Sequence, residues 1–197
     1  AIKYYKMAAD ENCFCAKNNL AIIYKNGFDI QKNLFFAIEL FQEVINNAMD
    51  PISMYNLAHL YLYNENLDDN SIDKSIDLLI NSLINNFNHS KELLCLAIVK
   101  KYKTVNSQII KKLFDEKLKQ KDVDSLVSEI YQFIVFQKID HIDNFKYYFN
   151  SFSERDYVYN YNKEAELTPS FMSEKVDEEN SHYQKLTKYF YEGFKQS

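Results

Sequence analysis

Apolar and small side chains recur through residues 1–103 at intervals of three and four, which places them on one face of an α-helix. Two kinds of segment alternate. The first kind carries a stripe of four such residues, as in Ala16, Leu20, Ile23 and Tyr24, and again in Ser53, Leu57, Leu60 and Tyr61. The second kind carries a different stripe, Leu34, Ile38, Phe41 and Ile45, and again Ile72, Ile76, Leu79 and Leu83. The pattern predicts alternating first and second helices, each with one buried side.

Capping residues mark the ends of these helices. Asp50 precedes Pro51, and aspartate is a typical N-cap residue. Proline is favoured as the first helical residue because the N–H at that position has no partner within the helix. Gly27 follows the first helix and can adopt the positive φ that closes a C-terminus. Residues 64–70 fill the corresponding loop of the next pair without a glycine. We therefore predict a helix start at Pro51 and a helix end just before Gly27.

The two kinds of segment form a repeat. Asn19-Leu20-Ala21 recurs 37 residues later as Asn56-Leu57-Ala58, and a weaker copy, Leu96-Ala97, follows after a further 39 residues. The stripes of the second helices recur at an offset of 38. The alanine in each copy allows a neighbouring helix to approach closely. Because one helix pair cannot bury both of its faces, repeats of this kind stack into a solenoid.

These residues resemble a known family. The segment Ala1 to Asp10, then Asn19-Leu20-Ala21 with Tyr24 and Gly27, and then Ala37-Ile38, is similar to the Sel-one-like repeat, a relative of the tetratricopeptide repeat with longer units. Alanine stands at 21 and 58 where the family has glycine. The resemblance implies an all-α fold, an α-solenoid of stacked antiparallel helix pairs. It also implies a non-catalytic adaptor or scaffold, in signalling or protein quality control, that needs no cofactor.

The chain divides into three predicted parts. Residues 1–103 carry the Sel-one-like repeats, and residues 104–153 keep helical spacing without the motif, so we expect degenerate helical repeats that continue the solenoid. Residues 154–197 are predicted to form a polar linker and a C-terminal amphipathic helix. Its stripe is Tyr183, Leu186, Phe190 and Phe194. This helix is expected to cap the open end of the solenoid, with a partner groove or a membrane surface as alternatives.

Composition narrows the function classes. The chain has 197 residues, of which 47% are hydrophobic, with only two Gly and two Pro, so an all-β fold or a nucleotide-binding α/β fold is nearly excluded. The net charge is −5 and the single arginine is Arg155, which argues against a nucleic-acid partner. Three cysteines and four scattered histidines match no metal-site spacing.

No apolar run approaches the roughly 20 residues that a transmembrane helix needs. The sequence as given shows no secretory signal, so we expect a cytoplasmic protein, unless a signal was removed. The start inside a predicted second helix suggests a fragment of a longer polypeptide.

The candidate binding site is the side of the first helices opposite the buried stripe. Its residues are Asn18, Ile22, Lys25, Tyr55, His59 and Leu62. By the resemblance, this side lines the concave surface, where a partner protein or peptide would bind. The side is more apolar than a solvated face, so it either binds a partner or packs on another segment of the chain. His59 is interpreted as a contact residue rather than a catalyst.

A search for catalytic groups finds no nucleophile with a base, no carboxylate pair in a structural context and no glycine-rich phosphate loop. We therefore predict no enzyme, no catalytic residue, no metal and no cofactor. The function predicted is a protein-protein interaction scaffold. The alternatives are a structural helical domain that positions a catalytic domain of a larger protein, and a helical hydrolase or transferase with a pocket that the sequence does not reveal.

Overall fold

A computed structural model describes residues 2–64, 67, 70–103, 105–115, 120–139, 142–153 and 156–157, and the regular secondary structure of these residues is entirely α-helical. In chain order the helices are α1 (Ile2–Asp10), α2 (Phe14–Asn26), α3 (Leu34–Ala48), α4 (Pro51–Tyr63), α5 (Ser71–Ile84), α6 (Ser90–Tyr102), α7 (Ser107–Asp115), α8 (Gln120–Phe136) and α9 (Ile142–Phe152). The all-α prediction is confirmed for this part of the chain. The predicted C-terminal helix with Tyr183, Leu186, Phe190 and Phe194 lies outside the described residues.

The described residues form two compact units, one of residues 2–48 and one of Met49–Tyr157. In the first unit, α2 packs against both α1 and α3. Small residues lie at the contact, since Ala8, Ala16, Ala21 and Ala37 are buried. Their lack of bulk lets the helices approach closely, as the repeat predicts.

Gly27 ends α2 in the predicted way. Its φ of 77° lies in the left-handed region, and its N–H donates to the carbonyl of Ile23 at 2.8 Å. A side chain at this position would also meet Lys32, whose Cβ lies 3.1 Å from the place of an added Cβ. The glycine therefore satisfies a terminal carbonyl in a conformation that other residues adopt only with strain.

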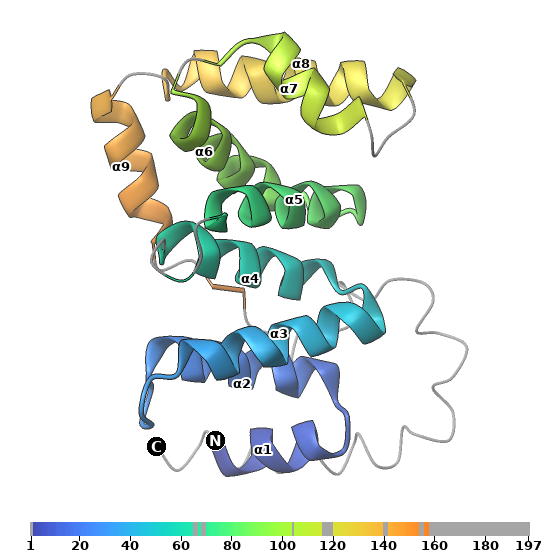
Figure 1. Cartoon of the computed structure of the whole chain (residues 1–197), viewed down its shortest axis with the longest axis vertical. Helices are drawn as coiled ribbons and strands as arrows, with labels where there is room; N and C mark the ends of the chain where they lie inside the picture. Colours follow the sequence, from blue (N-terminus) through green and yellow to red (C-terminus); the bar gives the residue numbers. More distant parts are fainter. Residues whose placement is uncertain are drawn as a thin grey trace. The chain divides into compact units, whose positions relative to one another are not determined.

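In the second unit, α5 packs against both α4 and α6, and α7 packs against α8 (Figure 1). Serines of α5 join it to α4. Ser75 donates to the carbonyl of Ala58 at 2.9 Å, and Ser82 donates to the carbonyl of Pro51 at 2.6 Å. Consecutive helices thus contact each other as pairs, whereas their assembly into a continuous solenoid stays a prediction.

The start of α4 also matches the sequence. Asp50 accepts a hydrogen bond from the N–H of Ser53 at 2.6 Å, and Pro51 occupies the first turn. At the other end, Asn64 takes the role that glycine has in the first pair. Its backbone N–H and its side-chain amide both donate to the carbonyl of Leu60, at 3.1 and 2.9 Å. Asparagine is one of the few residues whose side chain can close a helix in this way.

The repeated positions of the first helices form the core. Leu20, Leu57 and Leu96 are buried, as are the alanines that follow them. Burial exceeds the one-sided prediction, however, because every residue of α4 from 53 to 62 is buried. The side of α4 opposite its stripe therefore does not face solvent.

We predict that Gly27→Ala lowers the free energy of unfolding by about 1–2 kcal/mol, because an L-residue at positive φ is strained. Gly27→Asn should cost less, since asparagine tolerates this conformation better. Urea denaturation of the two variants measures the difference. Equal stability of Gly27→Ala and wild type would contradict the prediction.

We also predict unequal thiol reactivity. Burial raises the pKa of the Cys95 thiol, so little of the reactive thiolate forms at neutral pH. Cys13 is also buried, whereas Cys15 is partly exposed. Iodoacetamide labelling of the native protein, followed by peptide mass spectrometry, should modify Cys15 first and Cys95 only on denaturation. Native labelling of Cys95 at the rate of Cys15 would refute this order.

Candidate functional site

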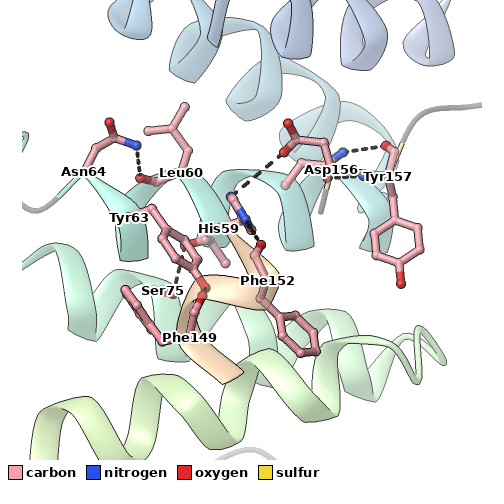
Figure 2. Close-up of polar contacts among 11 residues, drawn as sticks. His59, Leu60, Tyr63, Asn64, Ser75, Phe149, Phe152, Asp156 and Tyr157 are labelled. Carbon is pink, nitrogen blue, oxygen red and sulfur yellow. Dashed lines mark hydrogen bonds and ion pairs between the residues drawn. The ribbon is translucent and has the colours of Figure 1, made fainter. Parts of the chain in front are cut away.

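Three polar side chains of α4 lie in a row and contact a later part of the chain. They are Asn56, His59 and Tyr63, whose spacing of three and four residues places them along one side of the helix. The later part comprises residues 142–153 and 156–157, which we call the returning segment. The bonded residues are 86 to 101 positions apart in the sequence. Figure 2 shows this site, which lies entirely within the second unit.

Two residues of the row cap the C-terminus of α9. The hydroxyl of Tyr63 donates to the carbonyl of Phe149 at 2.5 Å. Nε2 of His59 lies 2.7 Å from the carbonyl oxygen of Phe152, and because a carbonyl only accepts, Nε2 carries the hydrogen. Both carbonyls belong to the last turn of α9, where the helix itself provides no N–H partner. Side chains of α4 thus complete a helix that lies far from α4 in sequence.

The third residue, Asn56, binds both main-chain groups of Tyr157. Its amide nitrogen donates to the carbonyl of Tyr157 at 2.8 Å, and its amide oxygen accepts from the N–H of Tyr157 at 2.9 Å. Asn56 is fully buried, so this pair of bonds has little competition from water. All three contacts of the row therefore reach main-chain atoms, which every amino-acid sequence offers.

The side chain of Tyr157 lies among three other rings. Its ring centroid is 4.9 Å from that of Tyr55 and 5.0 Å from that of Phe87, both in edge-to-face orientation. The ring of His89 lies 5.0 Å away and is tilted. Edge-to-face pairs are favourable beyond the area that they bury. These contacts involve the side chain of the returning segment, whereas the bonds of Asn56, His59 and Tyr63 involve its main chain.

Phe149 makes a second aromatic contact. Its ring stacks on that of Tyr63 with 4.3 Å between the centroids. Nζ of Lys100 lies 4.3 Å from the centroid of the Phe149 ring and makes a cation–π contact with it. The same Nζ donates to the carbonyl of Leu62 at 3.1 Å, in the last turn of α4. Lys100 of α6 therefore links the C-terminus of α4 to α9.

His59 also lies near a carboxylate. Its Nδ1 is 3.9 Å from Oδ1 of Asp156, and both side chains are nearly enclosed. Protonation of Nδ1 would add a charge attraction to Asp156, whereas the Nε2 bond to Phe152 exists in both protonation states. Nε2 is engaged by a main-chain carbonyl inside the protein, so both nitrogens of His59 face the returning segment.

The six residues predicted to line the binding side are all buried. They are Asn18, Ile22 and Lys25 of α2, and Tyr55, His59 and Leu62 of α4. For α4, the alternative that this side packs on another segment describes the structure. Tyr55 and His59 contact the returning segment, and the carbonyl of Leu62 accepts from Lys100.

His59 was among the predicted site residues, whereas sequence reasoning missed Asn56 and Tyr63, the other two polar residues that hold the returning segment. Asn56 stands in the repeat motif at the same position as Asn19, and the repeat alone does not indicate its hydrogen bonds. Tyr63 recurs as Tyr102, which is a weak signal of a shared role. Nothing in the local sequence around Asp156 and Tyr157 connects them to α4, because that contact spans about half of the chain.

Comparison of the chain with protein-family models, with curated proteins and with solved structures finds no match. In the described ranges, no group of three or more His, Cys, Asp or Glu is placed to hold a metal ion. Nor does any helix in the part that the structure describes combine the length and apolar character needed to cross a bilayer.

We predict that Tyr63→Phe lowers the free energy of unfolding by about 1 kcal/mol, because it removes one partly buried hydrogen bond and keeps the stacked ring. It should also speed hydrogen exchange of α9. The matched control is Tyr147→Phe, which removes a hydroxyl from an exposed ring of α9 and should change stability by less than about 0.5 kcal/mol. Equal effects of the two changes in urea denaturation and hydrogen exchange would show that the cap on α9 contributes nothing.

Proposed function

We propose that the protein is a non-catalytic scaffold that binds polypeptide segments on the side of α4 formed by Tyr55, His59 and Leu62. By the repeat, the corresponding side of α2, formed by Asn18, Ile22 and Lys25, is proposed as a separate site of the first unit. One observation carries this proposal. The α4 side holds main-chain atoms of a segment from elsewhere in the chain through Asn56, His59 and Tyr63.

The chemistry of the row suits this role. Main-chain carbonyls and N–H groups are strong hydrogen-bonding groups, and a site that satisfies them in a buried setting can bind a peptide with limited regard to its sequence. The bonds of Asn56 to Tyr157 supply a donor and an acceptor to one residue, as an adjacent β-strand does in strand addition. These contacts favour peptide binding over catalysis, because the polar groups of the site are engaged by main-chain atoms.

The site residues are buried, so a partner must replace the groups that cover them. Exchange of this kind is a property of low-stability segments, which open without global unfolding. The repeat supports a separate, equivalent site in the first unit, since Asn19 of α2 occupies the position of Asn56 and is also buried.

Because the α4 side is already covered by the returning segment, a second candidate function is also favoured. The chain would then be a structural helical domain that positions a catalytic domain of a larger protein and binds no separate partner. In that case the returning segment would never exchange with an external peptide.

Selection of random peptides against the full chain distinguishes these candidates. We expect peptides whose affinity falls at least tenfold in Asn56→Ala, because that variant loses two main-chain hydrogen bonds. Tyr147→Ala, in an exposed residue of α9, is the control and should leave the affinity unchanged. Failure to select any peptide that depends on Asn56 would contradict the scaffold proposal and favour the structural function.

A further inference from the structure

The returning segment shows which side chains the α4 side accepts, in addition to the main chain. Its residues at the site come in a defined order along the chain. An aromatic helix terminus with Phe149 and Phe152 is followed by the pair Asp156 and Tyr157. Each of the four makes a contact with the α4 side or its flanking residues.

Of these, Tyr157 contacts three rings. The three rings around it, Tyr55, Phe87 and His89, come from α4 and from the residues between α5 and α6. An aliphatic side chain would fill this space without the edge-to-face contacts, so a planar ring is preferred. Asn56 fixes the main chain of the same residue, which places the ring among the other three.

Charge supports an acidic residue just before the tyrosine. The carboxylate of Asp156 lies beside Nδ1 of His59, and a basic residue in its place would set two cations against each other whenever the imidazole is protonated. At the other end, the ammonium group of Lys100 lies over the ring of Phe149, where an aromatic face attracts a cation.

We propose that the α4 side recognises an acidic–tyrosine segment that follows an aromatic helix terminus, and that residues 149–153 and 156–157 are a built-in ligand that competes with a partner segment of the same chemistry. This inference rests on the proposed function. Because the built-in ligand is tethered, its effective concentration at the site is of millimolar order, so an external segment binds weakly until the tether is outcompeted or released. The returning segment thereby acts as an intramolecular inhibitor of its own binding site.

The probe is a fluorescent, acetylated and amidated peptide with the sequence of residues 149–157, FNSFSERDY. Fluorescence anisotropy should show at least tenfold tighter binding to full-length Tyr157→Ala than to wild type, because the variant weakens the internal competitor. Tyr157→Phe, which keeps the ring, and Tyr147→Ala, which alters an exposed ring of α9, should both behave as wild type. A peptide ending in alanine instead of tyrosine should bind at least tenfold more weakly.

A second measurement does not depend on the folding of any variant. Wild-type protein with the unlabelled peptide in excess should lose hydrogen-exchange protection at the N–H of Tyr157, which Asn56 otherwise binds. Equal affinity of the peptide for wild type and a folded Tyr157→Ala would overturn the inference. So would unchanged protection at Tyr157 under saturating peptide, or equal binding of the alanine-ended peptide.

The two proposals fail in different ways. If selected random peptides bind through Asn56 but the 149–157 peptide does not, the scaffold function stands and the acidic–tyrosine preference is wrong. If peptides of neither kind bind through Asn56, the scaffold function is wrong and the acidic–tyrosine preference fails with it.

Discussion

The second unit depends on the satisfaction of main-chain groups at the buried side of α4. The helix α4 is buried along residues 53–62, where a polar group that finds no hydrogen-bond partner costs about 1–3 kcal/mol. Asn56 and His59 meet this constraint by binding the carbonyls and an N–H of the returning segment. The bond of His59 to Phe152, together with that of Tyr63 to Phe149, also satisfies carbonyls in the last turn of α9.

The two sides of α4 make different contacts. On one side, Ala58 allows α5 to approach closely, and its carbonyl accepts from Ser75. On the other side, rings and amides hold a segment that is distant in sequence. The first side packs against the next helix in the chain, α5. The second side depends on a contact between residues far apart in the sequence. The chain loses conformational entropy when the loop between them closes, and the hydrogen bonds must offset that cost.

The difference between the two sides of α4 supports the proposed function. A side that binds main-chain atoms through three side chains has the chemistry of a peptide-binding surface, and a tethered occupant gives such a surface a means of regulation. The ring site around Tyr157 adds a side-chain preference to contacts that are otherwise independent of sequence. The scaffold function and the acidic–tyrosine preference are both proposals that follow from these contacts.

The sequence by itself determined the helices and their ends. The spacing of residues such as Leu57 and Leu60, the Asp50 cap and Gly27 are local features, and the forces that they report act within a few residues of each one. The sequence also marked the opposite side of α4 as too apolar for solvent, and it left open whether a partner or another segment covers it. Only the tertiary structure decided that Phe149, Phe152 and Tyr157 cover that side. Their contacts join residues 86 to 101 positions apart, and no local pattern of hydrophobicity or capping encodes a pairing over that distance.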